Sequence, residues 1–169
     1  LAVGEIGLHF FAPGANVDRQ AHFLREQLRI AADLDLPVVL HVRRAIDAVL
    51  GQLRATPVCG GIAHAFNGSR EQAEHFIKRG FCLGFGGAMT YPGSTRIRRL
   101  AATLPIESIV LETDAPDIAP AWLDRDNGCA RNTPGELFRI AEVLAELRGV
   151  AVTNIIEVTA RNARRCLRM

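Results

Sequence analysis

Pro37-Val38-Val39-Leu40-His41 is a short apolar run that starts at a proline and ends in a histidine. Side chains that are apolar at consecutive positions are typical of a strand buried on both faces, as in a parallel sheet covered by helices. One similar run precedes this segment and three follow it. They are residues 2–8, 58–64, 81–86 and 108–113. The chain is therefore expected to hold five buried strands.

Amphipathic stretches separate these runs. The first of them has an apolar residue every three or four positions, which predicts one buried stripe on a helix. These residues are Phe23, Leu24, Leu28, Ala31 and Leu34. Similar patterns predict further helices at 45–53, 69–80, 97–101 and 134–148, and from 153 onward. Ser69 is expected to cap one of them and Gly149 to end another.

Strand and helix patterns alternate at regular spacing, which favours right-handed βαβ units. Such units build either a doubly wound open sheet or a β/α barrel. Gly84-Phe85-Gly86-Gly87 lacks the Gly-x-Gly-x-x-Gly spacing of a dinucleotide-binding fold, and polar residues gather where the strands end, so a barrel is favoured. A complete eight-unit barrel typically has about 250 residues. Residues 1–169 are therefore interpreted as the carboxyl-terminal five units of a single TIM-type (β/α)8 barrel of the α/β class, with the first three units missing.

The composition is that of an ordinary globular protein, since 49% of the residues are hydrophobic and 22% are charged. The formal net charge of +2 is too close to neutrality to predict nucleic-acid binding by itself. No apolar run approaches the roughly 20 residues of a membrane-spanning helix, so we expect a cytoplasmic protein without membrane contact. The four cysteines form no Cys-x-x-Cys pair, which favours buried thiols in a reducing compartment.

Four polar residues lie within or at the carboxyl ends of different apolar runs: Glu5, His41, His64 and Asp114. In a closed barrel these strand ends meet at one face, where the catalytic groups of this architecture lie. Carboxylates and imidazoles are the natural ligands of a divalent ion such as Zn²⁺, Mn²⁺ or Mg²⁺. A single histidine at a strand end is more often a hydrogen-bonded structural residue. Four such residues at corresponding positions, however, predict a metal site.

The segments around these residues resemble the signatures of the TatD-type metal-dependent hydrolases, a family of amidohydrolase-like barrels. The segments are Ala2-Val3-Gly4-Glu5-Ile6-Gly7-Leu8, Leu36-Pro37-Val38-Val39-Leu40-His41-Val42-Arg43, Gly60-Gly61-Ile62-Ala63-His64-Ala65-Phe66-Asn67-Gly68-Ser69 and Leu111-Glu112-Thr113-Asp114-Ala115-Pro116. Further matches are Gln20, Phe23, Gln27-Leu28, Arg131-Asn132-x-Pro134 and Thr159-x-Arg161-Asn162. The resemblance implies a (β/α)8 barrel that holds one or two divalent ions and hydrolyses phosphodiester bonds, typically as a deoxyribonuclease.

Carried over by position, the resemblance implies that Glu5, His41 and His64 are metal ligands, with Glu5 bridging when two ions are present. Asp114 would be both a ligand and the catalytic residue that holds or deprotonates the attacking water. The sequence departs from the family in two places. The family's His-x-His motif of the first barrel strand is absent, because no two of the five histidines are two positions apart. In addition, His9 stands where the family usually carries aspartate.

Four further residues are candidates for a place in the same site. Arg43 could clamp a substrate phosphate, although a solvated residue at a helix start fits about as well. His9 could contact phosphate or act as a changed ligand, although a loop histidine bonded to nearby backbone is the simpler interpretation. Tyr91 could stack on a base, although a single exposed tyrosine more often has no special role. Glu112 lies two residues before Asp114 on one strand face, so it could orient that residue or form a structural ion pair.

These motifs favour a hydrolase that cleaves DNA phosphodiester bonds with one or two Mg²⁺, Mn²⁺ or Zn²⁺ ions, and DNA or another phosphodiester is the expected partner. Two alternatives stay open. The same barrel could hydrolyse an ester or amide bond, because a fold does not determine its substrate. A degenerate barrel could instead bind metal or nucleic acid without turnover, which the missing His-x-His pair and His9 would favour.

Overall fold

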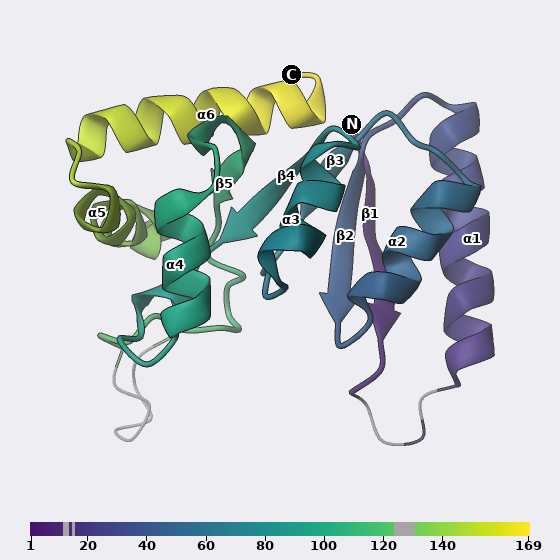
Figure 1. Ribbon diagram of the computed structural model, residues 1–169, viewed down its shortest axis with the longest axis horizontal. Coiled ribbons are helices and arrows are strands. Elements are labelled where there is room, and N and C mark those ends of the chain that lie inside the picture. Colours follow the sequence, from purple (N-terminus) through teal and green to yellow (C-terminus); the bar gives the residue numbers. More distant parts are fainter. Residues whose placement is uncertain (12–13, 15, 124–130) are drawn as a thin grey trace. The chain divides into compact units, whose positions relative to one another are not determined.

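The computed structural model describes residues 1–11, 14, 16–123 and 131–169 (Figure 1). The strands are β1 (Val3–His9), β2 (Val38–Arg43), β3 (Gly61–Ala63), β4 (Phe81–Phe85) and β5 (Ile109–Leu111). The helices are α1 (Val17–Asp33), α2 (Ile46–Ala55), α3 (Arg70–Ile77), α4 (Thr95–Thr103), α5 (Leu137–Arg148) and α6 (Val152–Leu167). Short 3-10 helices lie at η1 (Gly87–Thr90), η2 (Ile106–Ser108) and η3 (Pro134–Glu136). Among the described residues, no helix combines the length and the apolarity needed to cross a membrane.

The five expected strands form one sheet in the order β1-β2-β3-β4-β5. The pairs β1–β2, β2–β3 and β3–β4 are parallel, as buried strands joined by helices predict. Two strands are shorter than expected, since β3 covers only Gly61–Ala63 of residues 58–64 and β5 only Ile109–Leu111 of residues 108–113. Gly60 has a φ of 112°, which is outside the strand region. Ser108 belongs to a 3-10 turn, in which its N–H donates to the carbonyl of Pro105 (3.0 Å).

The described chain divides into two compact units. Unit 1 comprises Leu1–Leu83 and Ala163–Met169, and unit 2 comprises Gly84–Asn162. The boundary falls within β4. Three of the candidate ligands belong to unit 1, namely Glu5, His41 and His64, whereas Asp114 belongs to unit 2.

In unit 1, α1 and α2 pack beside β1 and β2 (Figure 1). The buried residues of α1 are Leu24, Leu28 and Ala31. They confirm the centre of the predicted stripe, but its outer members are not part of the core, since Phe23 is 51% exposed and Leu34 is 62% exposed. Leu34 lies past the last turn of α1. The ring of Phe23 lies beside the guanidinium of Arg19 on the same helix (Cζ to ring centre 5.5 Å).

The helix ends follow local signals in the sequence. The hydroxyl of Ser69 accepts the N–H of Gln72 (3.2 Å), and the amide oxygen of Gln72 accepts the N–H of Ser69 (3.0 Å), which forms a capping box at the start of α3. The helix ends at Ile77 instead of Gly80, because the chain turns there and the N–H of Gly80 donates to the carbonyl of Ile77 (3.0 Å). Gly149 ends α5 in the left-handed conformation, with a φ of 64°, as predicted.

Asn162 joins α6 to the segment that leads into β5, within unit 2. Its side chain is buried, and Nδ2 donates to the carbonyls of Ile106 (2.7 Å) and Ile109 (2.8 Å). We expect Asn162→Leu to lower the free energy of unfolding by about 2–4 kcal/mol, because two carbonyls lose a buried donor. Urea denaturation measures the change. Asn154→Leu, the same change at an exposed position of α6, should cost less than about 0.5 kcal/mol, and an equal loss in both variants would contradict the prediction.

Candidate metal centre

The candidate ligands of unit 1 lie on one face of neighbouring strands. Along β1, Ile6 is buried in the core, whereas Glu5 and His9 occupy positions of the opposite face. β2 runs parallel to β1, and Gly7 is paired with His41. Because Gly7 has no side chain, the backbone of His41 can approach it, and a methyl group there would overlap the His41 carbonyl. The glycine therefore allows the two strands to hold Glu5 and His41 in contact.

Glu5, His41 and His64 bring three donor atoms together. Oε1 of Glu5 lies 2.9 Å from Nδ1 of His41 and 2.5 Å from Nε2 of His64, and the two nitrogens are 3.2 Å apart. His64 directly follows β3 and continues its ladder, since its N–H donates to the carbonyl of Leu40 in β2 (3.1 Å). Two adjacent strands and the residue that directly follows the third thus contribute one ligand atom each.

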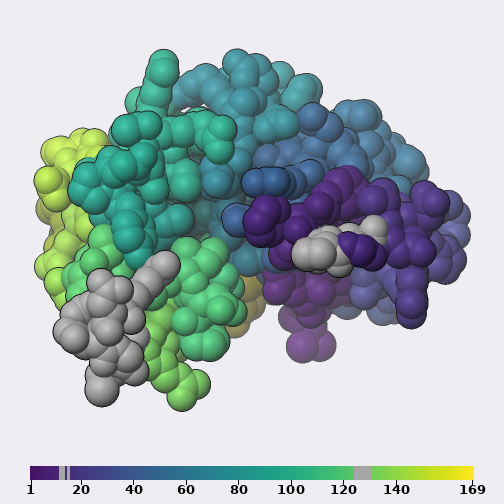
Figure 2. Space-filling model, turned by 90° about the horizontal axis from the view of Figure 1, so that it is seen from below, coloured from purple at the N-terminus to yellow at the C-terminus, as the bar shows by residue number. Residues whose placement is uncertain are grey.

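The chemistry and spacing of these donors fit a divalent ion. Ligand atoms about 2.1 Å from one ion lie about 3.0 to 3.4 Å from one another, and two of the three separations in the cluster, 2.9 and 3.2 Å, are close to that range. The side chains of Glu5 and His41 are 47% and 34% exposed, so solvent reaches the cluster. Figure 2 views the protein from the side toward which β1 and β2 run, and the purple and blue segments of unit 1 are at the surface there. Three protein ligands and access for solvent are typical of a catalytic rather than a structural site.

His9 contacts the ring of His41 on the side away from the other donors. Nδ1 of His9 lies 2.9 Å from Nε2 of His41, and the ring planes are within 8° of parallel, so a hydrogen bond can lie in line between them. The amide of Gln20 holds the backbone of His9 at both polar atoms: Oε1 accepts its N–H (2.7 Å) and Nε2 donates to its carbonyl (3.2 Å). The backbone of His9 is thus fixed by Gln20, and its side chain contacts the candidate ligand His41. The expected contact of His9 with phosphate stays a prediction.

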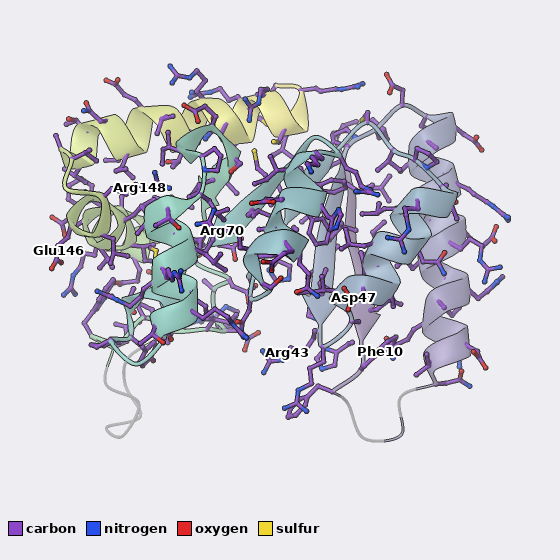
Figure 3. The ribbon with its side chains drawn as sticks, in the orientation of Figure 1. Phe10, Arg43, Asp47, Arg70, Glu146 and Arg148 are labelled. Atoms are coloured by element: carbon purple, nitrogen blue, oxygen red, sulfur yellow. The ribbon has the colours of Figure 1, made fainter. Side chains whose placement is uncertain are left out.

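Arg43 and Phe11 lie beside each other where β1 and β2 end. Arg43 is paired with His9 in the strand register. The carbonyl of Arg43 accepts the N–H of Phe10 (2.9 Å), and these two residues are labelled in Figure 3. The ring centre of Phe11 is 5.4 Å from Cζ of Arg43 and 4.3 Å from Cζ of Arg44. Phe11 is half-exposed and both arginines are exposed, so an aromatic ring and two cations face solvent together where β1 and β2 end. Only Arg43 was expected here from the sequence, although the position of Phe11 just after a strand, near two arginines, is also a signal that can be read from it.

Left-handed backbone follows three of the strands. Arg44, Ala65 and Asp114 have φ values of 54°, 45° and 52°, and they come just after β2, β3 and β5. This conformation costs a residue other than glycine about 1 kcal/mol or more, and such residues gather at functional sites. The left-handed residues thus follow β2, which carries His41, follow His64 after β3, and include the candidate ligand Asp114 itself.

Asp114 lies in unit 2, in a segment that Asn132 holds. Asn132 is buried, and its Nδ2 donates to the carbonyls of Thr113 (2.8 Å) and Asp117 (2.5 Å), which flank Asp114. Sequence reasoning included Asn132 only in the resemblance, because a contact made 19 positions away has no local signal. Since the three clustered donors belong to unit 1, the role of Asp114 as ligand and base stays a prediction.

Glu112 packs against the glycine-rich end of β4. Its N–H donates to the carbonyl of Phe85 (3.2 Å), and its carboxylate lies so close to Gly84 that a methyl group at that position would overlap it. Gly86 is similarly close to Glu112. Gly84 thus makes room for the carboxylate of Glu112, and Gly86 makes room for its backbone. β5 ends at Leu111, so the expectation that Glu112 and Asp114 share one face of a strand is wrong. The expected action of Glu112 on Asp114 stays a prediction.

Tyr91 follows η1 and is held by a contact within unit 2. Its hydroxyl donates to the carbonyl of Ala119 (3.0 Å), and the hydroxyl of the neighbouring Thr90 accepts the N–H of Ala121 (2.7 Å). These bonds join the 90–91 segment to the 119–121 segment. The expected stacking of Tyr91 on a base stays a prediction.

Comparison with known proteins identifies relatives over almost the whole chain. The model of a family described as TatD related DNase matches residues 1–168. The uncharacterized metal-dependent hydrolase YjjV of Escherichia coli (strain K12) is 40% identical over 163 residues, which are 96% of this chain and 61% of that protein. The 3'-5' ssDNA/RNA exonuclease TatD of Citrobacter rodentium (strain ICC168) is 32% identical over 166 residues, which are 96% of this chain and 63% of that protein.

Solved structures agree with the fold. The crystal structure of YjjV, a TatD homologue from Escherichia coli K12, matches with a TM-score of 0.92 and 37% identity over 99% of this chain and 64% of that one. A TatD family hydrolase from Entamoeba histolytica matches with a TM-score of 0.85 at 18% identity, over 98% of this chain and 62% of that one, and supports the fold alone. The expected amidohydrolase-like α/β barrel fold is therefore confirmed. The chain spans less than two thirds of the length of these relatives.

Proposed function

Since this chain belongs to the TatD related DNase family, we propose that it is the carboxyl-terminal portion of a single cytoplasmic hydrolase barrel that cleaves DNA phosphodiester bonds with bound divalent metal. The observation that carries this proposal is the convergence of Glu5, His41 and His64 on one point. The relative from Citrobacter rodentium supports a nucleic-acid substrate, because its name describes a single-stranded DNA and RNA exonuclease.

Glu5, His41 and His64 would hold the ion, and their two imidazoles favour Zn²⁺ or Mn²⁺ over Mg²⁺. A divalent ion held there supplies Lewis acidity, which favours ionisation of water and neutralises negative charge on phosphoryl oxygens. Glu5 contributes the negative charge of this cluster, and both histidines contact its Oε1. The three donors account for one ion, and a second would require further ligands.

The other candidate residues would act on the water and the substrate. Asp114 would accept the proton of the attacking water, since a carboxylate is a suitable general base. Arg43 ends β2 beside the cluster, and its guanidinium can donate two parallel hydrogen bonds to a phosphate. Glu112 would orient Asp114, and Tyr91 would stack on a base.

His9 would position His41. When Nε2–H of His41 donates to Nδ1 of His9, Nδ1 of His41 is left to face Glu5 and His64. We expect His9→Phe to weaken Zn²⁺ binding about 10- to 100-fold, the usual effect of losing such a partner. His9→Asp restores an acceptor and should keep the affinity close to that of the unchanged chain. Competition with a chromophoric chelator measures both, and full affinity in His9→Phe would contradict this role.

The proposed function is tested by hydrolysis of an end-labelled single-stranded DNA oligonucleotide. The enzyme is the protein encoded when the reading frame is extended upstream of Leu1, assayed beside the 169-residue chain. We expect cleavage by the extended protein in Mn²⁺ or Zn²⁺, loss of cleavage in EDTA, and recovery when metal is added back. A panel of carboxylic esters and amides in the same buffers tests the alternative chemistry. Metal binding without hydrolysis of any substrate would indicate a non-catalytic barrel and overturn the proposal.

A further inference from the structure

Cys82 and Cys166 are 84 positions apart in the sequence, yet their Sγ atoms lie 2.6 Å from each other within unit 1. Cys82 belongs to β4, and Cys166 lies one residue before the end of α6. Both are buried, with 1% and 7% of their surface exposed. The guanidinium of Arg165 also reaches this pair, since Nη2 donates to Sγ of Cys82 (3.5 Å). Two sulfur atoms in direct contact need little movement to form a covalent bond.

We propose that Cys82 and Cys166 are an oxidisable dithiol that a hydroperoxide converts to a disulfide. The position of the pair in the chain gives this bond a specific consequence. Cys82 lies just before unit 2 begins at Gly84, and Cys166 lies just after unit 2 ends at Asn162. The disulfide would therefore close a loop that contains every residue of unit 2. A covalent closure of so long a loop restricts the unfolded chain and stabilises the folded one.

Cys166 is the thiol that reacts first. Its hydrogen bond with Cys82 and the positive charge of Arg165 outweigh burial and lower the pKa of Cys166 to about 6, so its thiolate is present at neutral pH. The same hydrogen bond and burial raise the pKa of Cys82, which therefore keeps its proton. The pair thus holds a nucleophile beside a thiol that can resolve the first product.

The hydroperoxide is the oxidant that converts the two thiols to a disulfide. The Cys166 thiolate attacks one peroxide oxygen, the O–O bond breaks, and the leaving oxygen takes a proton to become water or an alcohol. The sulfur of Cys82 then attacks the sulfenic acid on Cys166. The S–S bond forms, the S–O bond breaks, and the leaving hydroxide takes the thiol proton of Cys82 to become water. The two sulfurs together lose two electrons, which the hydroperoxide gains.

Peptide mapping tests the proposed bond. The 169-residue chain is treated with hydrogen peroxide and digested with trypsin without reduction. We expect the tryptic peptides 80–96 and 166–168 to be joined, with a mass two hydrogens below their sum, and to separate in dithiothreitol. Cys59→Ser should leave the link unchanged, because Cys59 is exposed and outside the pair. Cys166→Ser should abolish the link. Cys129 lies outside the described residues, and its Ser variant is a second control.

A stability measurement provides the second readout. Oxidation should raise the thermal unfolding midpoint by at least about 5 °C, and dithiothreitol should reverse the rise. Cys82→Ser and Cys82→Ala, checked for folding by circular dichroism, should lack the rise. The proposal is overturned if peroxide leaves both thiols free, if Cys166 becomes a sulfinic acid without a link, or if either cysteine joins another partner. Neither metal nor nucleic acid takes part, so the result is independent of the proposed function.

Discussion

Replacing Glu5 with glutamine should reduce the affinity of the chain for Zn²⁺ by more than about 100-fold, which exceeds the usual effect of losing an outer-shell partner. Oε1 of Glu5 is the atom that both His41 and His64 contact, and it carries the charge that opposes the cation. Glutamine keeps the size of the side chain but removes that charge. Isothermal titration or chelator competition measures the affinity, and Mn²⁺ should show the same loss.

The matched control for this variant is Glu26→Gln. Glu26 lies on the exposed side of α1, where it pairs with Arg29 (2.8 Å), so the control removes one carboxylate charge away from the site. Its affinity for Zn²⁺ should equal that of the unchanged chain. If Glu5→Gln bound Zn²⁺ as tightly as this control does, the proposed ligand set would be wrong.

Asp114→Asn should lower the turnover number of the extended protein on single-stranded DNA by about 10³- to 10⁴-fold at saturating metal. Asparagine has nearly the same shape as aspartate but cannot accept the proton of the attacking water. Asp114 has a φ of 52° in the structure. Asparagine also adopts this left-handed conformation readily, so the backbone should be preserved. Initial rates across a range of metal concentrations measure the loss.

A measurement of Zn²⁺ affinity distinguishes the loss of turnover in Asp114→Asn from damage to the donor cluster. Glu5, His41 and His64 remain in Asp114→Asn, so we expect its Zn²⁺ affinity to fall much less than in Glu5→Gln. Asp117→Asn, with an exposed side chain in the same segment, is the matched control and should keep its activity. Unchanged turnover in Asp114→Asn would remove Asp114 from the proposed mechanism.

The strands and helices could be predicted because their signals are local. Consecutive apolar residues such as Val38-Val39-Leu40 suit a strand buried on both faces, and β2 begins at Val38. Ser69 and Gln72 lie three residues apart, which is the spacing that a capping box needs. Exposure was harder to predict. Phe23 continues the apolar pattern of α1 but lies at the edge of the buried stripe, and only the position of the sheet determines where that edge falls.

The three clustered ligands could be nominated because each lies in or just after its own apolar run. Strand order then brings them together, since parallel neighbours place residues such as Gly7 and His41 in register. The residues that support the site had no comparable signal. Gln20 holds His9 from a helix, and Asn132 holds Thr113 from a distant segment. Both contacts depend on how the segments between them pack.

By itself, the sequence determined which segments become strands and helices and which acidic and imidazole residues could meet, because hydrophobic pattern and turn chemistry act over a few neighbouring residues. Only the tertiary structure decided that Nε2 of His41 faces His9 and that Cys82 touches Cys166. These contacts join residues 32 and 84 positions apart. Strand register and helix packing determine such contacts, and they depend on the burial of the whole core rather than on any one segment.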